Sequence, residues 1–222
     1  MKKVSLLLLL GLFIFPLAAC GGGNGESSDV SSSSSANQAN VSNTKKESSS
    51  GNKKDSSLLV NNKKYKKLAI NSGANDSKII DEKDFKTSWS DNSWSGVNMQ
   101  IDEVSILKVS DFKNYSDQEY QGFVVVHFII DNSEKDVNLY PEQATLVTNS
   151  GEQTEGSYEL DHFAGELMKG SKVQGYAAYP LTNLDSVDSI NQIRLKFRGD
   201  YNTDDYNDEN YSHDYDITID LQ

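Results

Sequence analysis

Residues 122–130, which read Gly-Phe-Val-Val-Val-His-Phe-Ile-Ile, constrain the fold more than any other stretch of the chain. Successive side chains of a β-strand point to opposite faces, and here apolar residues occupy both alternating sets of positions. Five β-branched residues and two phenylalanines in nine positions favour a strand over a buried helix, and Asp131, Asn132 and Ser133 then supply turn chemistry. We therefore predict a central strand that is covered on both faces, or nearly so.

The segments around this strand show the two-residue alternation of further strands. They lie at residues 97–109, 137–140, 143–148, 153–158, 172–179, 190–197 and 215–221. A slip of phase near Asp102 indicates a bulged edge strand, and Gly151 indicates a hairpin turn with positive φ. Short helical turns are expected only at 79–85 and 160–169. Seven or eight short antiparallel strands without intervening helices predict an all-β sandwich.

The N-terminus has the pattern of an export signal. Two lysines precede an apolar run at residues 6–15 that is too short to span a membrane as a helix. The sequence Leu17-Ala18-Ala19-Cys20 follows and resembles the lipobox of bacterial lipoproteins. This resemblance implies cleavage before Cys20, lipid on its sulfur, and stable anchoring by two or more acyl chains such as palmitate. The alternative is an ordinary signal peptide with an incidental cysteine.

The next segment has the composition of a tether. Residues 21–57 are mainly Ser, Asn, Gly and Lys, and their few apolar side chains cannot offset the entropy of ordering them. We predict a signal peptide at 1–19, a disordered linker at 20–84 and a folded domain at 85–222. Such linkers are similar to those of Gram-positive lipoproteins, which implies a domain held by lipid at the extracellular face of the cell membrane. Because Cys20 is the only cysteine, the domain contains no disulfide.

Charge is distributed unevenly along the chain. Residues 21–88 hold eleven lysines and eight acidic residues, whereas residues 89–222 hold eight basic and 25 acidic residues. An acidic domain is repelled by phosphate backbones, which argues against nucleic acid as a partner. The lysine-bearing segment ahead of the domain is the part suited to an anionic surface, either wall polymer or lipid headgroups. The alternative for that segment is a plain spacer.

A second resemblance covers residues 97–197. It rests on residues 124–128, Asn132, Tyr140, Pro141, Leu146, Gly151 and 168–176, which occur in this order. Together they resemble an immunoglobulin-like domain that recurs, functionally uncharacterised, at the end of many Gram-positive lipoproteins. The resemblance implies an immunoglobulin-like β-sandwich without catalytic residues. The chain departs from that pattern after Phe197, where the last hairpin is long and acidic.

This last hairpin is the strongest candidate for a binding site. Residues 200–216 contain seven Asp or Glu residues and no Lys or Arg, and tyrosines recur there at every fifth position. The candidate binding residues are Tyr201, Asp204, Asp205, Tyr206, Asp208, Glu209 and Tyr211. Three interpretations stay open: a solvated connecting hairpin, a tyrosine-rich surface similar to an antibody loop, and a calcium loop. The spacing of a calcium loop fails at Asp205, where it needs glycine, and at Tyr211, where it needs glutamate.

Signals of catalysis are absent from the sequence. His127 lies in the central strand far in sequence from His162 and His213, so we expect a hydrogen-bonded imidazole and no bound metal. No nucleophile elbow, phosphate loop or dinucleotide fingerprint occurs, so we expect no enzyme, no catalytic residues and no cofactor. The expected function is a binding module at the cell envelope, with an envelope protein or wall polymer as partner. The alternative is a structural or assembly accessory, stabilised by calcium at the acidic hairpin.

Overall fold

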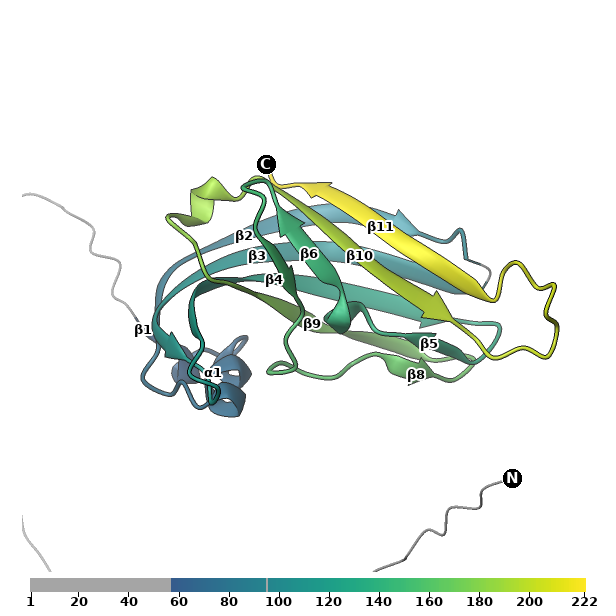
Figure 1. The fold of residues 1–222 in the computed structure, drawn as a ribbon, viewed down its shortest axis with the longest axis horizontal. Helices are drawn as coiled ribbons and strands as arrows, with labels where there is room; N and C mark the ends of the chain where they lie inside the picture. The colour runs from purple at the N-terminus through teal and green to yellow at the C-terminus, as the bar shows by residue number, and fades with distance from the viewer. Residues whose placement is uncertain (1–56, 95) are drawn as a thin grey trace, which may run out of the picture. The chain divides into compact units, whose positions relative to one another are not determined.

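The computed structural model describes residues 57–94 and 96–222, and the structural statements below refer to these residues. Two antiparallel sheets pack face to face around one apolar core (Figure 1). This arrangement confirms the predicted all-β sandwich. The predicted signal peptide, Cys20 and the linker up to residue 56 lie outside the described residues.

The two sheets contain eleven strands within the described part of the chain, three more than the eight strands predicted at most. The first sheet has the order β1 (Ser57–Leu58), β2 (Lys78–Asp91), β3 (Val97–Lys113), β4 (Glu119–Asn132) and β9 (Lys172–Leu181). The second has the order β7 (Gln153–Glu155), β6 (Thr145–Thr148), β10 (Gln192–Asp200), β5 (Val137–Leu139) and β8 (Gly165–Leu167), with β11 (Ser212–Asp220) also paired to β10. The strands that the sequence pattern did not identify are β1, β2 and β8.

Strand β4 lies in the middle of the first sheet, between β3 and β9. Its inward side chains, Val124, Val126, Phe128 and Ile130, are all buried in the core between the sheets. On the outer face Phe123 and Val125 are buried as well, whereas His127 and Ile129 are half-buried. The predicted cover on both faces is therefore present over the first half of the strand and becomes partial beyond Val126.

The outer face of β4 is covered by a segment that the sequence assigned to the linker. Residues 57–75, which we call the N-terminal cap, include β1, η1 (Leu59–Asn61) and α1 (Lys66–Ser72). Leu59, Tyr65 and Leu68 have no exposed surface and belong to one cluster with Phe123 and Val125. Burial of large apolar side chains contributes roughly 1.5–3 kcal/mol each, which is enough to order a segment of otherwise polar composition. The predicted boundary between linker and domain at residue 84 is corrected accordingly, because residues 57–84 belong to the domain.

Two expected helical turns are strands or extended chain instead. Residues 79–85 lie in β2, where a register shift between Ile79 and Asp81 breaks the alternation that would have identified a strand. Residues 160–169 contain β8, and there the ring of Phe163 lies over Gly175 of β9. A Cβ atom at Gly175 would come within 2.4 Å of that ring, so the close approach depends on glycine.

Strand β3 confirms one part of its prediction and corrects another. A register shift between Ile101 and Glu103 leaves Asp102 as the bulged residue, as expected from the slip of phase. The strand is internal, however, because β2 pairs with it on the edge opposite to β4. The turn between β6 and β7 also forms as predicted, with Gly151 at a φ of 83°.

The two ends of the sandwich carry different structures. The N-terminal cap, with β1 and α1, lies at one end (Figure 1). The loop of residues 201–211, which joins β10 to β11 and which we call the acidic loop, lies at the opposite end. The first described residue and the candidate binding residues are therefore separated by the length of the long strands.

Candidate functional site

The acidic loop exposes most of its charged and aromatic side chains. Asp204, Asp205, Glu209 and Tyr211 are exposed, and Tyr206 has a fully accessible side chain. The loop forms because β10 and β11 pair along the whole of β10, from Gln192 to Asp200, so the chain must return between their ends. It presents carboxylates and tyrosine rings to solvent on a connection between two long strands.

The base of the acidic loop is held firmly. The backbone N–H of Tyr201 donates to the carbonyl of Tyr211 over 2.9 Å, which closes the loop. Trp94, which lies between β2 and β3 and is only 3% exposed, donates from Nε1 to the carbonyl of Asn210 over 2.9 Å. The Trp94 ring also stacks on Tyr201, with the ring centroids 6.1 Å apart. The loop is therefore anchored to the core of the sandwich.

Two of the predicted binding residues act within this scaffold. The Tyr201 hydroxyl donates to Asp208 Oδ2 over 2.6 Å, and Asp208 Oδ1 also accepts the N–H of Asn210. The hydrogen bond from Tyr201 lowers the pKa of Asp208 below its usual value. Lys135, from the turn after β4, places its ammonium 3.9 Å from the centroid of the Tyr201 ring. Tyr201 and Asp208 thus shape the loop, and the remaining five candidates face solvent.

The carboxylates of the acidic loop do not converge on one point. Asp205 Oδ1 accepts the backbone N–H of Asn207 over 2.9 Å, so this oxygen caps a local turn. Across residues 57–94 and 96–222, no three His, Cys, Asp or Glu side chains are grouped as metal ligands. The geometry therefore gives the calcium interpretation no ligand set.

An open hollow of about 1000 Å³ lies beside the base of the acidic loop. Its lining includes Tyr201, Asn202 and Thr203 from the loop, together with side chains from β5, β8 and their flanking turns. This lining contains the basic residues Lys135 and Lys169 and the acidic residues Asp136 and Glu166, so both signs of charge are present. Of the seven predicted binding residues, only Tyr201 contributes to it.

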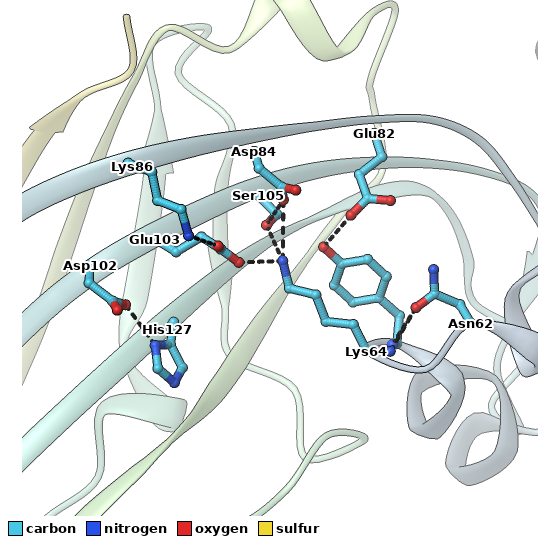
Figure 2. Close-up of polar contacts among 10 residues, drawn as sticks. Asn62, Lys64, Glu82, Asp84, Lys86, Asp102, Glu103, Ser105 and His127 are labelled. Atoms are coloured by element: carbon cyan, nitrogen blue, oxygen red, sulfur yellow. Dashed lines mark hydrogen bonds and ion pairs between the residues drawn. The ribbon is translucent and has the colours of Figure 1, made fainter.

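A second polar cluster lies on the outer face of the first sheet, beside the N-terminal cap (Figure 2). Lys64 Nζ donates to the carboxylate of Glu103, to Ser105 Oγ over 2.8 Å and to Asp84 Oδ1 over 3.2 Å. The neighbouring Tyr65 hydroxyl donates to Glu82 Oε1 over 2.8 Å. These contacts attach the cap to β2 and β3. Sequence reasoning missed these contacts because it placed Lys64 in the linker. The available signal was an aromatic residue, Tyr65, among four lysines at residues 63–67.

The charges of this cluster argue against a serine–lysine catalytic pair. Burial by itself would lower the pKa of Lys64, but the hydrogen bond to Glu103 and further contacts outweigh it and raise that pKa. A lysine that activates serine must be neutral, whereas this one stays charged. Ser105 is also fully buried and donates to Asp84. The arrangement fastens the cap to the sheet.

His127 has the hydrogen-bonded environment that the sequence predicted. Its Nδ1 lies 2.6 Å from Asp102 Oδ1 (Figure 2), and its ring centroid lies 4.4 Å from that of Tyr176. The fold also brings His127 and His162 to the lining of one open hollow of about 520 Å³, which their separation in sequence did not reveal. His213 lies elsewhere, stacked on Trp94.

Comparisons with known proteins give structural neighbours only. No family model and no curated protein matches the chain. A functionally unknown protein from Listeria monocytogenes is similar with a TM-score of 0.46 and 10% identity, covering 70% of this chain and 93% of its own. A conserved hypothetical protein from Bacillus anthracis has a TM-score of 0.36 and 13% identity, covering 52% and 91%. The secreted protein MPT63 from Mycobacterium tuberculosis has a TM-score of 0.33 and 9% identity, covering 49% and 83%.

Helices in the described residues are short. None of them has the length and apolar character that crossing a membrane requires.

Proposed function

We propose that this chain is a lipoprotein anchored through Cys20 at the extracellular face of the cell membrane, and that its sandwich is a binding module. The observation that carries the proposal is the position of the acidic loop. It projects from the end of the sandwich opposite to the N-terminal cap, where the chain enters the domain (Figure 1). A domain tethered at the cap presents the acidic loop at its free end.

The structure of the loop supports recognition of a positively charged partner. Tyr206 and three carboxylates, those of Asp204, Asp205 and Glu209, are exposed on a base that Trp94 and Tyr201 hold in place. A fixed base reduces the entropy that binding would otherwise cost, and tyrosine supplies contact area with few rotatable bonds. The partner that fits this surface is a basic envelope protein or a cationic wall polymer.

A capture experiment with two matched variants tests the binding role. The chain from residue 21 to 222 is immobilised and exposed to envelope extract. The loop variant carries Asp204→Asn, Asp205→Asn, Glu209→Gln and Tyr206→Ser. The control variant also neutralises three carboxylates and removes one tyrosine, but away from the loop, at the exposed positions Glu119→Gln, Glu155→Gln, Asp185→Asn and Tyr158→Ser. We expect the loop variant alone to lose a captured component, and identical captures from both variants would count against the loop.

The anchor is tested separately through its single thiol. In the exporting cell, Cys20→Ala should abolish labelling by radioactive palmitate and move the protein from the membrane fraction to the medium. Ser27→Ala is a control in the same segment and should leave both unchanged. A protein that stays unlabelled and soluble with Cys20 present would refute the lipoprotein part of the proposal and leave the binding test unaffected.

A further inference from the structure

The N-terminal cap is a basic surface on an acidic domain. Residues 57–75 contain four lysines and no acidic residue. Lys64 forms an ion pair with Glu103, and Lys67 forms one with Asp161. Lys63 and Lys66 are exposed, and neither ammonium group has a carboxylate partner among the described residues. Two cations of the cap are therefore free to meet an external anion.

Apolar side chains are exposed beside these lysines. Ile70 is 47% exposed and follows Lys66 by four positions in α1, so the two side chains lie on one face of the helix. Tyr115, from the turn between β3 and β4, is 79% exposed. Its ring lies against Gly73 at the end of α1, where a Cβ atom would come within 2.5 Å of it. Lys66, Ile70 and Tyr115 thus form one exposed stripe along α1.

We propose that this stripe, together with Lys63, docks the cap onto an anionic phospholipid membrane. Lysines attract acidic headgroups, while an isoleucine and a tyrosine suit the boundary between headgroups and acyl chains. Such attraction needs a local positive surface, because the acidic remainder of the domain is repelled by the same membrane. The chain also enters the domain at the cap, so a membrane tether would bring this surface to the bilayer first.

The cap is attached rigidly enough for docking to orient the whole sandwich. Lys64 and Tyr65 fasten it to β2 and β3 through Glu103 and Glu82 (Figure 2). Asn62 holds the turn before α1, because its Oδ1 accepts the backbone N–H groups of Lys64 and Tyr65 over 2.8 and 3.0 Å. A membrane bound to this surface therefore fixes the direction of the strands. The inference goes beyond the proposed binding role. Its argument from a tether rests on the proposed anchor at Cys20, whereas the attraction of the cap for acidic lipid can be measured without that anchor.

Vesicle binding by the unlipidated chain tests the inference. The chain from residue 21 to 222 is mixed at low salt with vesicles of phosphatidylcholine alone or with added phosphatidylglycerol. Lys63→Gln with Lys66→Gln is compared with Lys169→Gln and Lys196→Gln, which remove the same charge at exposed positions outside the cap. Both variants keep every lysine of residues 21–56. We expect the parent chain to bind only the acidic vesicles. Binding should be about 30-fold weaker for the cap variant, because two surface lysines are lost, and it should be unchanged for the control variant.

The apolar part of the stripe is tested by a separate pair of variants in the same vesicle-binding measurement. Ile70→Ser should weaken binding to acidic vesicles several-fold, whereas Ile80→Ser, at an exposed position on β2 outside the cap, should not. Equal losses in the two lysine variants would assign the attraction to total charge and overturn the proposal. Absence of binding to acidic vesicles would overturn it too. Soluble polyphosphate bound through Lys63 and Lys66, without vesicle binding, would identify a phosphate polymer as the partner instead.

Discussion

At the scale of single residues, the side chain of Asn132 links β4 of the first sheet to the end of β8 in the second sheet. Its side chain is fully buried, and its Nδ2 lies 2.7, 3.2 and 3.1 Å from the carbonyl oxygens of Lys135, Leu167 and Met168. Asn132→Ala would leave these acceptors without their donor, so we expect it to lower the free energy of unfolding by about 2–4 kcal/mol. Urea titration measures the loss. Asn98→Ala, at an exposed position of β3, should change it by less than about 0.5 kcal/mol.

Glu142 gives the domain a predictable dependence on pH. Its side chain is 4% exposed, Oε2 has no hydrogen-bond partner among the described residues, and burial raises its pKa. Because the folded state holds this proton more tightly than the unfolded state, stability falls as pH rises from about 4.3 through the raised pKa. Glu142→Gln removes this dependence. We expect the variant to melt above the parent protein at pH 8, with the difference shrinking towards pH 4 in calorimetry. A constant difference would contradict the assignment.

At the scale of elements, the local sequence pattern predicted the structure where a strand kept a regular alternation or a turn had a characteristic glycine. The central strand, the bulge near Asp102 and the hairpin at Gly151 follow from alternation and turn chemistry, and all three are present. The cap was missed because its few apolar residues stand among lysines and asparagines, and only the outer face of β4 makes their burial favourable. The candidate loop was found because its residues are contiguous. Its supports, Trp94 and Lys135, come from other connections that only the fold brings together.

The cap should behave as part of the folding unit. A chain that begins at Asp76 would expose Phe123 and Val125, which the cap now covers, so we expect it to bind a hydrophobic dye and to unfold at lower urea. A chain that begins at Ser57 keeps the whole cap and should match the chain that begins at residue 21. Leu68→Ala offers a milder test in the intact chain and should cost about 2–4 kcal/mol, because this side chain has no exposed surface. Equal stability of all chains would show that the cap is not needed.

At the scale of the whole molecule, a basic cap and an acidic loop at opposite ends give the sandwich a direction relative to a membrane. Strand β4 alone has 14 residues, which at about 3.3 Å per residue separates its ends by roughly 45 Å. A fluorophore near the loop would therefore lie beyond contact with the bilayer when the cap is docked, whereas one near Tyr115 would touch it. Cys20 is the only native thiol, and the lipid that we propose on it would block it, so a single introduced cysteine could be labelled in the anchored protein.

The orientation can be measured with Ser116→Cys and Asn207→Cys, two exposed positions at the two ends. In vesicles that contain phosphatidylglycerol and nitroxide-labelled lipid, we expect quenching of the fluorophore at position 116 and none at position 207. High salt should reduce the quenching at 116, because screening weakens the attraction of Lys63 and Lys66, whereas the proposed lipid anchor would still hold the protein at the surface. Quenching of the two positions to the same extent would mean that the domain tumbles freely on its tether, and stronger quenching at 207 would mean that it docks through the acidic loop.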